Sequence, residues 1–172
     1  VDAWVADPAA AEATHGSISG WDTSRVDSMT FLFYEKSAFN EAIGGWDTSS
    51  VTTMHSTFYG TFDFNQPLDW DTSSVTTMYR TFSLAFAFNS ELAWDTSAVT
   101  GITHTFMSAE AFNQQLDWDT SAVTDMQYTF SRTPFNRPLV WDTSKMTGEY
   151  NFRGFSMCDK LPCGCIQSKS TC

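Results

Sequence analysis

Hydrophobic positions recur along this chain at a nearly constant spacing. Each unit contains a Trp followed directly by Asp-Thr-Ser, and these tryptophans are Trp21, Trp46, Trp70, Trp94, Trp118 and Trp141. They lie 25, 24, 24, 24 and 23 residues apart. In the unit that begins at Trp70, apolar residues follow at Val75, Met78 and Phe82, and a Phe-Asn pair closes the unit. A fixed period of this length is the signature of a repeat array in which each unit forms one coil.

Within each unit, the pattern predicts a short strand followed by a short helix. The residues Leu68 and Trp70 alternate with polar residues, which is typical of a strand. Between Ser73 and Phe82 the apolar residues are spaced i, i+3 and i+7, as on one face of a helix. The Asp-Thr-Ser before them is typical of a helix start. We therefore predict a repeat solenoid of mixed α/β class, with a short parallel strand and a short helix in each 24-residue repeat.

Three regions follow from this pattern. A single unit cannot bury its own apolar face, so equivalent Trp and Phe residues are expected to stack from coil to coil over residues 18–146, in five to six repeats. The Asn after each Phe is expected to bond the backbone of a neighbouring loop. Residues 1–17 are expected to form a helical N-terminal cap, with Asp7 as N-cap, Pro8 at the first helical position and Gly16 at the end. Residues 147–172 are expected to form a disulfide-rich C-terminal cap.

The cysteines indicate an oxidising compartment. All four lie in the last fifteen residues, at Cys158, Cys163, Cys165 and Cys172. Their spacing favours two disulfides, with three pairings open, and fits the paired C-x-x-C pattern of a zinc site poorly. We therefore expect a secreted or cell-surface protein. The chain begins without Met, which we interpret as a mature product whose targeting segment has been removed, although an arbitrary chain boundary looks the same.

Charge and composition narrow the possible functions. The formal net charge is -11 and the nine Lys and Arg residues are scattered, so neither nucleic acid nor an anionic membrane surface is an expected partner. No apolar run approaches the roughly 20 residues that span a bilayer. The sequence contains no phosphate-binding loop and no recognisable group of nucleophile, base and orienting residue, so we predict that the protein is not an enzyme.

An acidic column accompanies the tryptophans. It consists of Asp22, Asp47, Asp71, Asp95, Asp119 and Asp142. In a stack of coils these carboxylates would repel one another, so they need compensation. Either each carboxylate accepts hydrogen bonds from its own Thr-Ser turn, which we favour, or the column holds a row of Ca²⁺ ions. No other cofactor is expected.

The complete unit, from Phe-Asn through Trp-Asp-Thr-Ser to the Phe twelve residues after Trp, resembles the repeat of the BspA-like bacterial surface-protein family, also called DUF285. The resemblance covers about residues 18–146. It implies a leucine-rich-repeat-like, right-handed coil on a cell surface, with adhesion or partner binding as its role. The chain departs from the family pattern at Thr57, Thr81, Thr105 and Thr129, where Met is common, and in its cysteine-rich end.

The positions nine and ten residues after each Trp differ between units, which suggests a binding surface. The residues that we assign to it are His55, Ser56, Tyr79, Arg80, His104, Gln127 and Tyr128. We expect a non-enzymatic extracellular structural or binding module, a rigid scaffold for cell-surface recognition or adhesion with a protein or glycan partner. One alternative is a subunit that assembles head to tail into an extracellular fibre or matrix, with O-glycosylation of its Ser and Thr residues. A second alternative is an ice-binding protein that uses the stacked Thr residues.

Overall fold

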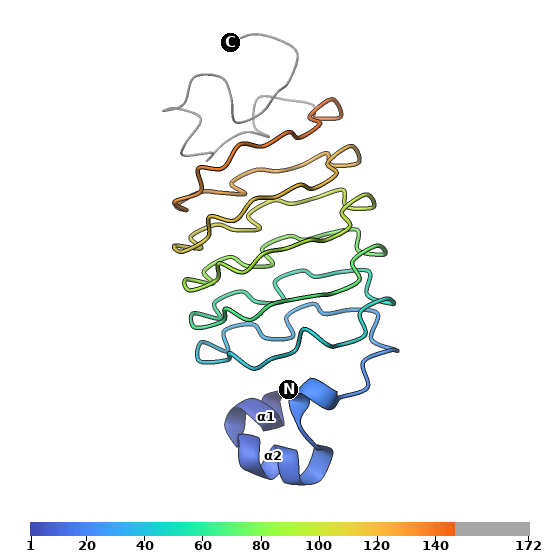
Figure 1. Cartoon of the computed structure of the whole chain (residues 1–172), viewed down its shortest axis with the longest axis vertical. Coiled ribbons are helices and arrows are strands. Elements are labelled where there is room, and N and C mark those ends of the chain that lie inside the picture. The colour runs from blue at the N-terminus through green and yellow to red at the C-terminus, as the bar shows by residue number, and fades with distance from the viewer. Residues whose placement is uncertain (147–172) are drawn as a thin grey trace.

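The chain winds into a stack of similar coils that begins at a helical N-terminal end. The computed structural model describes residues 1–146 and contains two helices, α1 (Asp2–Ala6) and α2 (Pro8–His15), followed by a 3-10 helix, η1 (Ile18–Gly20). Figure 1 shows both helices at one end, in blue, with the coils lying one above another. None of the helices in this part of the chain is long and apolar enough to cross a membrane.

The predicted strand–helix repeat, and with it the leucine-rich-repeat-like solenoid of mixed α/β class, is wrong. After η1, the described coils contain no helix and no strand, only isolated parallel bridges that join each coil to the next. These bridges are Ser28 with Thr53, Thr53 with Thr77, Thr77 with Gly101 and Gly101 with Asp125. They lie seven residues after each Trp, inside the segment that was predicted to be helical, and not in the predicted strand.

The reason is the direction of the backbone amides. Met78 N donates to Gly101 O at 3.0 Å and Phe82 N donates to Thr105 O at 2.8 Å, both in the following coil. Between them, Thr81 N donates to Met78 O and closes a turn within its own coil. An α-helix would need these amides for carbonyls four residues back in the same segment. The apolar residues that were predicted to form one face of a helix are therefore buried, but the backbone that carries them is irregular and not helical.

In the five coils that begin at Trp21 to Trp118, two positions adopt the left-handed backbone conformation, and this produces the alternation of amide directions. They lie ten and fourteen residues after each Trp. The residues concerned are Phe31, Ser56, Arg80, His104 and Tyr128 at the first position, and Glu35, Gly60, Leu84, Ser108 and Arg132 at the second. No regular helix or strand contains such residues. None of the ten is β-branched, as expected where φ is positive.

The core consists of files of equivalent aromatic rings. Successive Trp rings lie 6.1–6.5 Å apart between centroids and within 11° of parallel. The Phe rings twelve residues after each Trp stack at 5.2–5.7 Å. These Phe side chains are almost fully buried, at no more than 2% exposure. The coils are thus joined by ring stacking in the core as well as by the backbone hydrogen bonds between them.

Side-chain hydrogen bonds tie each coil to its neighbours. The indole Nε1 of Trp70 donates to Ile43 O at 3.0 Å, and the hydroxyl of Thr72 donates to Asp95 O at 2.8 Å. The predicted asparagine ladder is confirmed: the Oδ1 of Asn65 accepts from Asn89 N at 2.8 Å, and the same bond recurs between the other coils. Thr81, which departs from the family pattern, donates to Met54 O at 2.9 Å.

The helical N-terminal segment has the predicted signals. Asp7 caps α2 by accepting from Ala10 N at 3.0 Å, Pro8 is the first helical residue, and Gly16, with a φ of 73°, is the C-cap after His15. Trp4 is buried and meets Trp21 of the first coil edge to face at 6.0 Å. An ion pair of 2.8 Å joins Asp2 to Lys36. The predicted C-terminal cap, with its four cysteines, lies outside the described residues.

Candidate functional site

An aromatic strip runs along the outside of the stack, across five coils. We define it as the rings of Phe31, His55, Tyr79, His104 and Tyr128. Their successive centroid distances are 5.0, 4.9, 5.8 and 5.1 Å, so each ring contacts the next. Each ring comes from a different coil, either nine or ten residues after the Trp of that coil.

Two further tyrosines widen the strip at its N-terminal end, and an arginine side chain lies against its central ring. Tyr34 contacts Phe31 and stacks on Tyr59 of the next coil at 4.8 Å. The guanidinium of Arg80 lies 5.0 Å from the centroid of the Tyr79 ring, within the range of a cation–π contact. Phe31 is 51% exposed, whereas the other four rings of the strip are half-buried, so most of the strip is both accessible and held in place.

The two histidines of the strip are biased toward the neutral form. Burial lowers the pKa of His55 below its ordinary value, and the nearby charge of Arg80 lowers it further. The pKa of His104 is also lowered, first by burial and then by Arg80. Because the ordinary value is about 6.5, both imidazoles are mostly uncharged at neutral pH. Arg80 then supplies the formal charge of the strip.

Several buried polar atoms of residues at or near the centre of the strip are unpaired. Within residues 1–146, six buried side-chain nitrogen or oxygen atoms have no hydrogen-bond partner, and four of them belong to two adjacent coils. These four are Arg80 Nε, Ser83 Oγ, Thr103 Oγ1 and His104 Nδ1. The two coils meet there through the bond from Arg80 N to Thr103 O, at 3.1 Å. Buried polar groups are usually paired, so this concentration needs an explanation.

The acidic column lies elsewhere in the repeat, and each carboxylate is occupied locally. The Oδ1 of Asp71 accepts from the backbone N of Ser73 at 3.0 Å and from its hydroxyl. The backbone bond is repeated at all six aspartates, which confirms the predicted turn. Among residues 1–146, no three His, Cys, Asp or Glu side chains come together in a way that could hold a metal ion.

The hydrogen bonds to these aspartates predict that the free energy of unfolding depends on pH in the acidic range. The side-chain and backbone bonds from Ser73 lower the pKa of Asp71. A lowered folded-state pKa contributes stability that is present above the unfolded value of about 3.9 and is lost as the pH falls through the folded value. We expect Ser73→Ala to raise the pKa of Asp71, measured by NMR titration, and to reduce the free energy of unfolding at pH 7 but not at pH 2.

The neighbouring serine provides the control for this prediction. The hydroxyl of Ser74 forms no hydrogen bond within residues 1–146, so Ser74→Ala should leave both quantities unchanged. Equal effects of the two substitutions at every pH would contradict the prediction.

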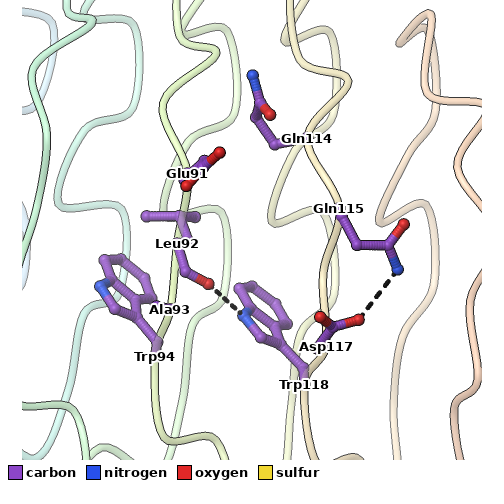
Figure 2. A pocket seen from close by; sticks show the side chains of 8 residues that line it. All are labelled: Glu91, Leu92, Ala93, Trp94, Gln114, Gln115, Asp117 and Trp118. Carbon is purple, nitrogen blue, oxygen red and sulfur yellow. Dashed lines mark hydrogen bonds between the residues drawn. The ribbon is translucent and has the colours of Figure 1, made fainter.

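A hollow of about 470 Å³ opens between two coils at a different position of the repeat. Figure 2 shows its polar side chains, Glu91, Gln114, Gln115 and Asp117, beside the parallel rings of Trp94 and Trp118. Trp118 donates to Leu92 O at 3.4 Å, and Gln115 donates to Asp117 at 3.1 Å. The two indoles are only 6% and 4% exposed. The hollow therefore offers polar contacts but no ring face on which a ligand could stack.

Comparison with known proteins identifies the family of the chain. The model of the Mycoplasma protein of unknown function family, DUF285, matches residues 7–116 and, in a second overlapping match, residues 92–160. The chain belongs to the DUF285 family. Neither the curated proteins nor the solved structures contain a match to this DUF285 chain. The overlap of the two matches at residues 92–116 reflects the repetition of one unit.

The structure places the predicted binding residues of this DUF285 protein as follows. His55, Tyr79, Arg80, His104 and Tyr128 come together in or on the strip. Ser56 is 2% exposed and does not contribute a surface, and Gln127 has no ring contact within the described residues. The sequence interpretation missed Phe31, Tyr34 and Tyr59. Phe31 lies ten residues after Trp21, so extending the variable column to the first unit would have found it.

Proposed function

We propose that this DUF285 protein is a non-enzymatic extracellular binding module that recognises a partner along its aromatic strip. The supporting observation is the continuity of the strip, in which five rings from five coils contact one another. Aromatic side chains provide a large contact area with little conformational freedom to lose, which suits recognition. The cysteine-rich end supports an extracellular location.

The backbone supports the same proposal because it holds the strip in register. The amide of Phe31 donates to His55 O at 3.0 Å, and the amide of Arg80 donates to Thr103 O at 3.1 Å. Equivalent bonds join the other coils as far as the coil of Tyr128, so Phe31, His55, Tyr79 and His104 are each tied to an adjacent coil at their own backbone. A preorganised surface binds with a smaller entropic cost than a flexible one.

A binding assay on intact cells tests this proposal. Fluorescently labelled wild-type protein should bind the surface of cells of the source organism, and a His55→Ala/Tyr79→Ala double variant should bind much less. Phe62→Ala is the control, because Phe62 is 42% exposed and stacks on Phe86 outside the strip. Equal binding by the wild type and the strip variant would contradict the proposal.

Head-to-tail assembly is a second candidate, favoured by the open edge of the first coil. In each later described coil, every second backbone carbonyl of this segment accepts a hydrogen bond from a backbone amide of the preceding coil. For example, Thr53 O accepts from Met29 N. The corresponding carbonyls of the first coil, those of Ser28, Thr30, Leu32 and Tyr34, accept no hydrogen bond within residues 1–146. Such an edge can pair with another chain. Sedimentation velocity that finds only monomers at high concentration would reject this candidate.

The threonine column gives no support to ice binding. Thr48, Thr72 and Thr96 are at most 2% exposed. Their hydroxyls donate to the carbonyls of the aspartates one coil further on, at 2.8–2.9 Å. A flat ice-binding face needs exposed hydroxyls, so this alternative is not carried further.

A further inference from the structure

We propose that the ligand of the aromatic strip is a neutral, extended polysaccharide that lies along the stack with one sugar ring against each coil. This inference rests on the proposed binding function and specifies its ligand. Three features of the strip support it, namely its spacing, its unpaired polar atoms and its charge.

The spacing of the strip matches a chain of sugar rings better than a peptide. The strip offers one aromatic ring every 4.9–5.8 Å. An extended peptide presents side chains to one face about every 6.7 Å, and a polyproline helix about every 9 Å. A β-(1→4)-linked chain of glucose, mannose or N-acetylglucosamine is straight because both bridging bonds are equatorial, and each of its rings advances the chain by a distance similar to one coil. Only the sugar chain stays in register over five rings.

The unpaired atoms of residues at the centre of the strip suit sugar hydroxyls. Thr103 contributes a hydroxyl that can both donate and accept, and Arg80 Nε donates. Ser83 is fully buried and lies out of reach of a ligand on the outside of the stack, whereas Arg80, Thr103 and His104 are half-buried. Sugar hydroxyls also donate and accept, and they can reach buried groups directly or through bound water. A ligand at Tyr79 and His104 would therefore satisfy groups that the protein leaves unpaired.

The charge distribution favours a neutral sugar over an acidic one. The chain has a formal net charge of -11, and the strip meets charges of both signs, because Arg80 lies over Tyr79 and the charge of Asp125 acts on His104. A polyanionic glycan would be repelled by the overall field of the protein. A neutral polysaccharide has no charged group that must be desolvated on binding. It needs only ring contacts and hydrogen bonds, both of which the strip provides.

Calorimetry with defined oligosaccharides tests this proposal. The full chain is titrated with cellohexaose, mannohexaose and chitohexaose, with the corresponding trisaccharides, and with a hexamer of galacturonic acid. We expect at least one neutral hexasaccharide to bind about tenfold more tightly than its trisaccharide, because it covers more rings. The acidic hexamer should not bind.

Variants test whether the strip makes the contact. Tyr79→Leu removes the central ring but keeps an apolar side chain, and it should weaken hexasaccharide binding about tenfold. Phe62→Ala, outside the strip, should leave the affinity unchanged. Tyr128→Ala provides a second strip variant if Tyr79→Leu unfolds, as judged by tryptophan fluorescence.

Either of two results would overturn the proposal. The first is that none of the neutral hexasaccharides binds, and the second is that a hexasaccharide binds equally well to the wild type and to the strip variants. If cells are nevertheless bound in a strip-dependent manner, the ligand is a protein and only the polysaccharide assignment fails. If cell binding is also independent of the strip, the proposed binding function fails with it.

Discussion

Replacement of Phe82 by Ala is expected to lower the free energy of unfolding by about 3–5 kcal/mol, the usual cost of emptying a buried aromatic site. Phe82 is completely buried in the middle of the stack. Its ring lies 5.3 Å from Phe58, 5.6 Å from Phe106 and 4.0 Å from Phe88. Because its neighbours belong to the coils on both sides, the substitution weakens two interfaces between coils at once. Chemical denaturation followed by tryptophan fluorescence measures the loss.

Phe62 provides the matched control, because the same substitution there removes a ring that is 42% exposed. Its stacking contact with Phe86, at 4.7 Å, is a surface contact. We expect Phe62→Ala to cost less than about 1.5 kcal/mol, the upper range for one aromatic pair. If the two variants lose equal stability, the files of rings do not hold the coils together.

Replacement of Gly44 by Ala is expected to destabilise the fold by about 1–3 kcal/mol, as overpacking does. A Cβ at this position would lie 2.6 Å from the backbone carbonyl oxygen of Pro67 in the next coil. The clash is with backbone, so no side-chain rotation can relieve it, and the two coils must move apart. The denaturation midpoint measures the effect.

The adjacent glycine separates this clash from a general effect of removing Gly. A Cβ on Gly45 would meet nothing within 4 Å, and its φ lies outside the left-handed region. Gly45→Ala should therefore be neutral or stabilising by about 0.4–1 kcal/mol, through the reduced entropy of the unfolded chain. A destabilisation as large as that of Gly44→Ala would contradict the packing explanation.

Part of the candidate site could be predicted from the sequence. The variable columns pointed to His55, Tyr79 and Arg80, because residues that change between otherwise equal units are free of core packing. The strip itself could not be read from any single column. Its rings lie ten, nine, nine, ten and ten residues after the Trp of their coils, because the aromatic residue occupies one position in some units and the next position in the others. Ser56 was wrongly included: it is 2% exposed, although Arg80 and His104 at the same position of their coils are half-buried.

The helix was mispredicted for a related reason. The apolar spacing of Val75, Met78 and Phe82 fits one face of a helix, and nothing in the composition argues against it. Nine of the ten left-handed positions in the coils are not Gly, so the usual sequence signal for this conformation is missing. The alternating backbone is stabilised by bonds such as Met78 N to Gly101 O, which join residues 23 positions apart and leave no local signature.

The sequence by itself determined the period, the membership of each column and the packing of like residues on like, because equal units at a constant spacing bring equivalent side chains into register. It also determined the cap of α2 and the turn at each Asp, since these depend on bonds between residues close in the chain. Only the tertiary structure decided the backbone conformation of the coils and the course of the aromatic strip. Both depend on hydrogen bonds between successive coils, and these form only once the units have stacked.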